Sequence, residues 1–184
     1  MRYITLLLCS IFAAFVVYIG HAAAQINIPV DPKVQLEDLS PQARSEVECL
    51  AQNMYFEAGL EPRLGQIAVA FVTHNRMQSG VFPDTYCGVV KQKVGTVCQF
   101  SWVCENRPKD MMRKGLLTTE NNLLYNKVTE LALSFYLYTE KFKDPTRGAL
   151  FFHADYVKPG WNNMKYTAQI GRHLFYNKVS RKAS

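Results

Sequence analysis

The segment from Ser40 to Pro62 most constrains the fold, because it carries a start signal, an apolar stripe and a stop signal for one helix. Ser40 followed by Pro41 is typical of a helix N-terminus, since the serine can cap the first turn and proline is tolerated there. Gly59 is the residue type that ends a helix in the left-handed conformation, and Pro62 prevents continuation. Apolar residues recur between them at spacings of three and four, which predicts one buried face: Val47, Leu50, Ala51, Met54 and Ala58.

Glu57 lies on this apolar face, in the last turn of the predicted helix. Burial disfavours the carboxylate, and the helix C-terminus carries partial negative charge, so both effects raise the pKa of Glu57. A glutamic acid that stays protonated near neutral pH is suited to general acid catalysis. The alternative is a half-exposed glutamate at a frayed helix end.

Three further helices are predicted from apolar spacing and end signals. The first follows closely after Gly59, so the two helices should form a hairpin in which Gln66 and Asn75 either face a groove or act as ordinary helix amides. Thr118 or Thr119 could cap the longest of them. Residues 105–117 are predicted to be a loop. The expected helices span 62–79, 86–90 and 120–142.

Extended segments are predicted mainly near the C-terminus. Residues 97–104 form a strand or an extended rim, and 149–153 and 169–176 form two antiparallel strands. A helical body beside a small antiparallel hairpin or sheet is an α+β fold.

The first 24 residues have the pattern of a secretory signal peptide: Arg2, an apolar run from Ile4 to Ile19 and small residues before Gln25. An uncleaved membrane anchor is the alternative. Residues 25–45 are predicted to be an extended lead-in and 46–184 a single domain. The protein is therefore expected to be periplasmic or secreted, and to meet the membrane only through its signal peptide.

Export places the remaining cysteines in an oxidising compartment, where disulfides form. They are Cys49, Cys87, Cys98 and Cys104, and their three possible pairings stay open. Loss of residues 1–24 removes Arg2 and no acidic residue, so the net charge falls from +6 to +5. This charge favours an anionic polymer as partner, and no basic helix with interleaved aromatics indicates nucleic acid.

Two other chemistries are weaker alternatives. His74, His153 and His173 do not form an H-E-x-x-H motif, so no metal site and no cofactor is expected. A cysteine–histidine hydrolase would need Cys87 or Cys104 with His153, and oxidation would remove that thiol. Sugar hydrolysis usually needs a second carboxylate, for which the sequence offers Glu61 or Asp155 without placing either. Four aromatic residues could stack on sugars or simply pack: Phe100, Trp102, Tyr156 and Trp161.

The order of motifs resembles the SleB/CwlJ cell wall hydrolases over about residues 46–177. The resemblance rests on Glu48–Ala51 with Tyr55–Ala58, on Gly65–Ala70 with Asn75-Arg76, and on Phe82–Thr85 with Cys87–Val90. It continues through Cys98–Ser101, Gly148–Ala154, Pro159, Trp161, Ile170-Gly171, His173 and Phe175. The spore-type members lack this set of cysteines.

The resemblance implies a lysozyme-like fold and cleavage of peptidoglycan between N-acetylmuramic acid and N-acetylglucosamine by lytic transglycosylation. The family's single catalytic acid corresponds to Glu57. Substrate contacts would come from Tyr55, Gln99, Ser101, His153 and Trp161. The glycan strand is the expected partner, and the protein is expected to be a monomer. A hydrolytic muramidase and a non-catalytic wall-binding module remain as alternatives.

Overall fold

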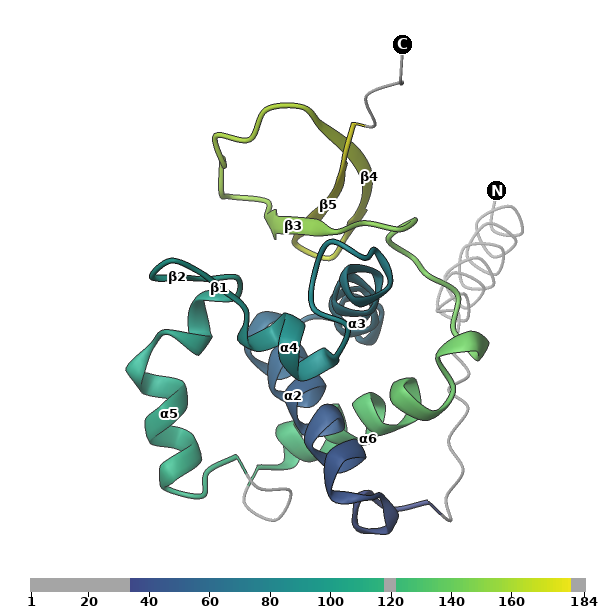
Figure 1. The fold of residues 1–184 in the computed structure, drawn as a ribbon, viewed down its shortest axis with the longest axis vertical. Helices are drawn as coiled ribbons and strands as arrows, with labels where there is room; N and C mark the ends of the chain where they lie inside the picture. The colour runs from purple at the N-terminus through teal and green to yellow at the C-terminus, as the bar shows by residue number, and fades with distance from the viewer. Residues whose placement is uncertain (1–33, 118–121, 180–184) are drawn as a thin grey trace, which may run out of the picture.

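The computed structural model describes residues 34–117 and 122–179 (Figure 1). The predicted signal peptide, most of the lead-in and the cap candidates Thr118 and Thr119 lie outside these ranges. The described part of the lead-in contains a short 3-10 helix, η1 (Leu36–Asp38), and the first turn of α2. In the described part of the chain, no helix is both long enough and apolar enough to cross a bilayer.

Helix α2 (Pro41–Ala58) lies at the centre of the helical body and packs against α3, α4 and α6 (Figure 1). The hydroxyl of Ser40 caps it by accepting from the amide of Ala43 at 3.3 Å, as the sequence predicts. The side chains on its apolar stripe are buried with residues of α3 and α6 in the main core, which includes Val47, Leu50, Met54, Phe71, Val128, Leu131 and Phe135.

The end of α2 at Gly59 is confirmed, but the predicted left-handed conformation is wrong, because Gly59 has φ −58° and ψ −32°. Glycine is needed here for space. A Cβ atom at Gly59 would lie 2.5 Å from the carbonyl oxygen of Tyr55. The helix therefore ends at a glycine in the right-handed helical conformation, and the backbone of the preceding turn leaves no room for a side chain at this position.

The predicted second and third helices are confirmed as α3 (Arg63–Gln78) and α4 (Tyr86–Lys91), the latter capped by the Thr85 hydroxyl. The segment after α4 is only partly extended. A short antiparallel hairpin follows, in which each strand has two residues: β1 (Lys93–Val94) and β2 (Val97–Cys98). The 3-10 helix η2 (Ser101–Val103) comes after it.

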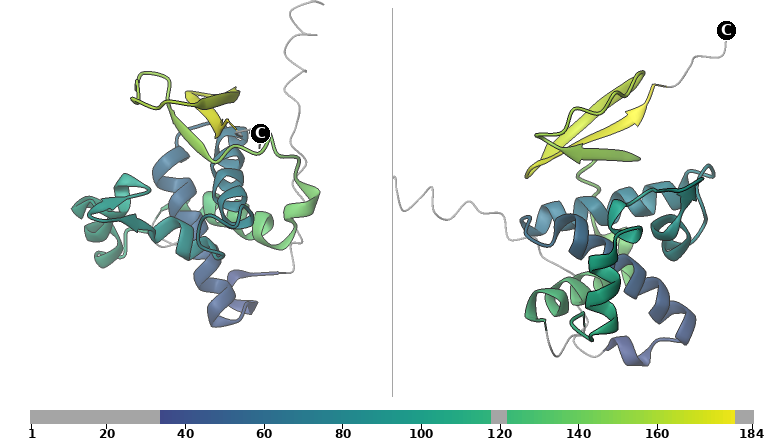
Figure 2. Two further views of the ribbon diagram at one scale, coloured as in Figure 1. Left: turned by 45° about the horizontal axis from the view of Figure 1, so that its top comes forward. Right: turned by 90° about the vertical axis from the view of Figure 1, so that its left-hand side faces the viewer.

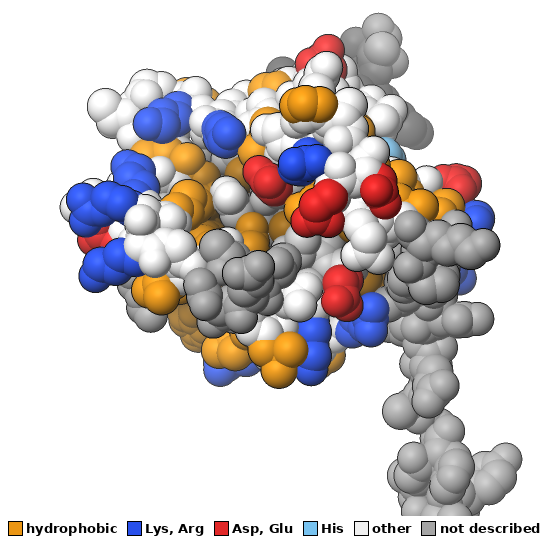
Figure 3. Space-filling model, turned by 90° about the horizontal axis from the view of Figure 1, so that it is seen from below, with side chains coloured by type: hydrophobic (Ala, Val, Ile, Leu, Met, Phe, Trp, Pro, Cys, Tyr) orange, Lys and Arg blue, Asp and Glu red, His pale blue; other side chains and the backbone are white. Residues whose placement is uncertain are grey.

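The loop predicted for 105–117 is wrong, because this segment contains helix α5 (Asn106–Arg113). Most of its described residues are polar and exposed, so the sequence shows no apolar stripe. Figure 3 shows the face seen from below Figure 1, where Lys and Arg side chains gather on the left, the side on which α5 lies. Among the residues whose exposure is described, Lys109, Arg113 and Lys114 are exposed cations of this helix and the residue after it.

The longest predicted helix is shorter than expected. Helix α6 (Leu123–Leu137) begins after Asn122, whose side chain accepts from the amide of Tyr125 at 2.9 Å. It ends before Tyr138, and a separate 3-10 helix, η3 (Thr139–Lys141), follows. The hydroxyl of Thr139 donates to the carbonyl of Phe135, a local bond that competes with continued helix.

Three strands, not two, form the C-terminal sheet, in the order β3-β5-β4 and antiparallel throughout. They are β3 (Phe151–Ala154), β4 (Met164–Ile170) and β5 (His173–Lys178). The predicted strand 169–176 thus contains the end of β4, a turn and the start of β5. The sheet forms a separate layer beside α3 (Figure 2), and Phe175 and Ile170 pack against Ala68 and Val72 of that helix.

The cysteines pair as Cys49–Cys87 and Cys98–Cys104. The first disulfide joins α2 to α4 across a sequence separation of 38, and the second closes a local loop across a separation of 6. In the chain-entropy picture, a disulfide stabilises more when it closes a longer loop.

We therefore predict that replacing both Cys49 and Cys87 by Ala lowers the free energy of unfolding by about 4 kcal/mol, and that replacing both Cys98 and Cys104 lowers it by about 2 kcal/mol. Urea unfolding of the two double variants at equal pH measures the difference. An equal or reversed order would contradict the entropic account.

Candidate active site

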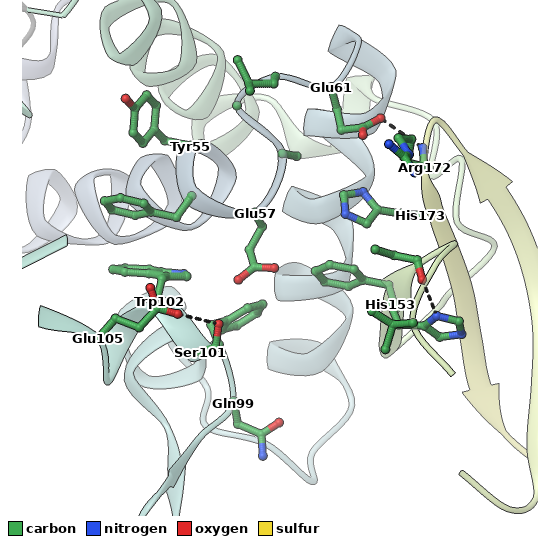
Figure 4. A pocket seen from close by; sticks show the side chains of 18 of the residues that line it. Tyr55, Glu57, Glu61, Gln99, Ser101, Trp102, Glu105, His153, Arg172 and His173 are labelled. Carbon is green, nitrogen blue, oxygen red and sulfur yellow. Dashed lines mark hydrogen bonds between the residues drawn. The ribbon is translucent and has the colours of Figure 1, made fainter. Parts of the chain in front are cut away.

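A cavity of about 970 Å³ lies between the end of α2, the segment around η2 and the C-terminal sheet. Glu57 points into it, with Trp102, Ser101 and Glu105 on one side and His173 and the sheet on the other (Figure 4). Its lining combines aromatic rings with acidic, basic and amide side chains, a surface suited to a ligand that has both apolar faces and polar groups.

Glu57 has the perturbed acidity that its position predicts. Burial raises the pKa of its carboxyl to about 7, the negative charge of Glu105 adds to this rise, and the positive charge of Arg76 opposes it. Desolvation is the largest cause. A carboxyl with this pKa is a proton donor near neutral pH and a carboxylate once it has donated.

Buried polar contacts fix the last turns of α2. The amide of Asn53, which is fully buried, donates to the hydroxyl of Thr73 in α3 at 3.1 Å, and its oxygen accepts from the indole of Trp102 at 3.1 Å. Phe56 stacks on Trp102 with ring centroids 4.7 Å apart. These contacts hold the wall around Trp102 against the helix that carries Glu57.

The amides left open by the sequence have structural roles. Gln66 donates to the carbonyl of Gly59 at 3.2 Å and so satisfies the end of α2, and Asn75 donates to Asp144 at 3.0 Å and to the carbonyl of Ala149 at 3.2 Å. Neither residue lines the cavity.

The opposite wall is attached through Glu61. Its carboxylate accepts from the backbone amide of Arg172, in the turn between β4 and β5, at 3.2 Å. The preceding Gly171 has φ +55°, and a Cβ atom there would lie 1.8 Å from the Glu61 carboxylate. Arg172 also pairs with Asp155 at 3.1 Å. Together these contacts join the sheet to the connection between α2 and α3.

Four of the five predicted substrate contacts line the cavity with Glu57, namely Tyr55, Gln99, Ser101 and His153. The hydroxyl of Tyr55 accepts from Asn122 at 3.0 Å, and that of Ser101 donates to Glu105 at 3.2 Å. The imidazole of His153 points away from Glu57 (Figure 4) and stacks on Tyr176.

Trp161 is not among the residues that line the cavity. Its ring packs edge to face on Phe151, His153 and Tyr176, with centroids 5.5 to 5.9 Å away. Because the neighbouring Phe152 lines the cavity, this aromatic group around His153 lies on the other face of the sheet.

The sequence did not single out Glu105, Arg76 or His173 as site residues, and all three line the cavity. A signal for Arg76 was available, since it lies four residues after Val72 on the apolar stripe of α3, a charge at a buried position like that of Glu57. Glu105 and His173 come from segments distant in sequence, and only the fold brings them to Glu57.

Two further carboxylates therefore share the cavity with Glu57, a fact that the sequence left open. Glu61 is engaged by Arg172 and Glu105 by Ser101. Among the described residues, no group of three or more His, Cys, Asp or Glu is placed to hold a metal ion. Both cysteines of the alternative thiol mechanism, Cys87 and Cys104, are in disulfides.

Comparison with solved structures supports the fold. The catalytic domain of the germination-specific lytic transglycosylase SleB from Bacillus anthracis is similar with a TM-score of 0.50 and 26% sequence identity, over 76% of this chain and 98% of that domain. This similarity and the observed helical body with its small antiparallel sheets confirm the predicted α+β, lysozyme-like fold class.

Curated relatives point the same way. The spore cortex-lytic enzymes of Halalkalibacterium halodurans and Bacillus subtilis are 28% and 26% identical over 135 residues, 72% of this chain. The chain spans 35% and 38% of the length of these two proteins. Residues 60–176 match the sequence model of the family described as Cell Wall Hydrolase, a match that begins just after Glu57 and spans more than half of the sequence. The chain thus belongs to the cell wall hydrolase family, as its motifs predict.

Proposed function

We propose that this protein cleaves peptidoglycan glycan strands between N-acetylmuramic acid and N-acetylglucosamine, with Glu57 as the catalytic acid. The observation that carries the proposal is the Glu57 carboxyl, held with a pKa of about 7 inside a cavity of about 970 Å³. The activities named for the B. anthracis domain and for the spore cortex-lytic relatives support the choice of substrate.

The mechanism follows from one carboxyl group that changes its protonation state. Glu57 donates its proton to the glycosidic oxygen as the bond to the muramic acid C1 breaks. The Glu57 carboxylate then takes the proton from the C6 hydroxyl of the same muramic acid, and the C6 oxygen bonds to C1. A 1,6-anhydro ring forms without water, and Glu57 ends protonated as it began.

The other proposed contacts follow from where the cavity residues lie. Tyr55, Gln99 and Ser101 can hydrogen-bond the acetamido and hydroxyl groups of the strand, and His153 contributes to the wall formed by β3. Trp161 is on the opposite face of the sheet from Phe152, so we place its contact with the strand outside the cavity.

Hydrolysis is the second candidate, and Glu105 is the observation that favours it. Inverting and retaining glycosidases use a second carboxylate in the same site, and Glu105 lines this cavity. Its carboxylate accepts from Ser101 and faces the solvent side of the cavity, where a water could be activated.

We propose that the protein acts outside the cytoplasm. The two disulfides fit an oxidising compartment, and the net positive charge, +6 for the full sequence and +5 without residues 1–24, favours association with anionic wall polymers. A monomeric state and export through residues 1–24 belong to the same proposal.

Digestion of purified peptidoglycan tests the reaction. We expect fragments with 1,6-anhydro-muramic ends from the wild-type protein, and a loss of at least about 10²-fold in rate for Glu57→Gln, which keeps the shape of the side chain and removes the acid. Mass spectrometry of the fragments identifies the ends. The control is Glu130→Gln, an exposed glutamate on α6, which should retain full activity.

Reducing ends without the anhydro ring would establish hydrolysis instead. Full activity of Glu57→Gln would reject Glu57 as the acid.

The pH profile should report the Glu57 carboxyl. Because only its protonated form is active at the first step, kcat/KM should fall tenfold per pH unit above pH about 7. Glu105→Gln removes the negative charge that helps to raise the pKa of Glu57, so this basic limb should move to lower pH. Rates measured from pH 5 to about 9 with soluble wall fragments distinguish this from an unchanged or upward-shifted limb, which would exclude the charge effect.

Stability should depend on pH through the same group. The folded state keeps the Glu57 proton between pH 4.5 and about 7, whereas the unfolded state has lost it, so stability falls as pH rises through this window. Glu57→Gln removes this loss. It should be more stable than wild type by up to about 3 kcal/mol at pH 8 and equally stable near pH 4. Urea unfolding at both pH values measures this, and a gain that is the same at pH 4 would refute it.

A further inference from the structure

Arg76 is a buried cation on the cavity side of α3. Only 5% of its surface is exposed, and its Nε donates to the carbonyl of Leu150 at 2.7 Å. Its guanidinium carbon lies 5.1 Å from the ring centroids of Phe82 and Phe100 and 5.7 Å from that of Phe151. The Leu150 carbonyl and the three rings hold the group in one place.

Within residues 34–117 and 122–179, no carboxylate forms an ion pair with Arg76, and the ion pairs are Arg113–Asp110 and Arg172–Asp155, both on the surface. The Nη1 atom of Arg76 is buried and has no hydrogen-bond partner among the described atoms. A buried guanidinium with an open donor is unfavourable unless an anion offsets its charge, so an anion near Arg76 would stabilise it.

Glu57 is the group placed to supply that anion. Both residues line the same cavity. Burial lowers the pKa of Arg76 to about 10, and the negative charge of Glu57 opposes this fall, just as the positive charge of Arg76 opposes the rise in the pKa of Glu57 that burial causes. The other charged groups around Glu57 cannot balance the charge of its carboxylate. Glu105 is negative as well. Across the cavity, on the side of the sheet and His173, Glu61 is also negative and accepts from the backbone amide of Arg172.

We propose that Arg76 is the counter-charge that stabilises the carboxylate which Glu57 leaves behind after it protonates the glycosidic oxygen. This inference rests on the proposed function of Glu57. Burial alone keeps the acid protonated and would also make proton donation unfavourable, because it would create an isolated buried anion. With Arg76 beside it, the same side chain can exist in both states that a one-carboxyl mechanism needs. Arg76 thereby acts through Glu57, as a positioning residue.

Titration of Glu57 in the substrate-free protein tests this role directly. The side-chain carboxyl carbon is followed by ¹³C NMR in protein labelled at glutamate, and its signal is identified by its absence in Glu57→Gln. We expect a wild-type midpoint near pH 7. Arg76→Met should raise the midpoint by about one pH unit, because it removes the positive charge that lowers the pKa of Glu57.

Two matched variants separate charge from structure. Arg76→Lys keeps the charge and loses the planar group, so its midpoint should stay within about 0.5 pH unit of wild type even where its stability falls. Arg76→Gln is neutral and keeps a donor for Leu150, so it should show the same upward movement as Arg76→Met and serves in its place if the methionine variant does not fold. In both neutral variants the basic limb of the rate profile should follow the NMR midpoint.

A folded neutral variant whose Glu57 midpoint is unchanged or lower would overturn the proposal. So would an Arg76→Lys midpoint as high as that of the neutral variants. Because the titration needs no substrate, its outcome is independent of whether the protein cleaves peptidoglycan. If Glu57→Gln stays active while the midpoint moves as expected, the electrostatic pair stands and the catalytic assignment fails.

Discussion

The enclosure of α2 by α3, α4 and α6 is the constraint on which the rest of the molecule depends. A helix surrounded in this way has few exposed positions, and its last turn has to end against other chain segments instead of in water. The Glu57 carboxyl, in the last turn of this helix, is desolvated by the walls of the cavity into which it points. The packing of α2 therefore fixes where the acid lies, and the cavity around it perturbs its acidity.

The charges around the cavity divide into two functional groups. On the helical side, the pKa of Glu57 is affected by the positive charge of Arg76 and by a second carboxylate, Glu105. On the sheet side, Glu61 and Asp155 are both occupied by Arg172. The sheet-side charges attach the sheet to the connection between α2 and α3, while Arg76 and Glu105 act on the protonation state of Glu57.

The sequence predicts well those features that local spacing decides. The bounds of α2 and α3 follow from a capping serine, a glycine and prolines, and the raised pKa of Glu57 follows from its place on an apolar stripe. The sequence does not predict helix α5, because the described residues of this helix are mostly polar. It does not predict the third strand, because Gly171 and Arg172 make a turn within a segment whose pattern is that of one continuous strand.

The composition of the site is harder to predict, because its walls come from segments far apart in the chain. Glu105 approaches Glu57 only through the η2 segment, which Trp102 fastens to Asn53. His173 is the first residue of β5, and the pairing of this strand brings it to the cavity. The aromatic group around Trp161 lies outside the cavity, because successive residues of β3 face opposite sides of the sheet. Residue type alone carries no information about these long-range placements.

The contact between Glu61 and the turn at Gly171 has a consequence for variation of the sequence. The carboxylate occupies the volume that any side chain at position 171 would need, so the two positions are coupled although 110 residues separate them. A larger residue at 171 requires a shorter one at 61, and this exchange would remove the hydrogen bond from Arg172 to Glu61 while Phe175 and Ile170 still pack on α3. The identity of the residue at 61 and that of the residue at 171 should therefore change together, with the acid itself unchanged.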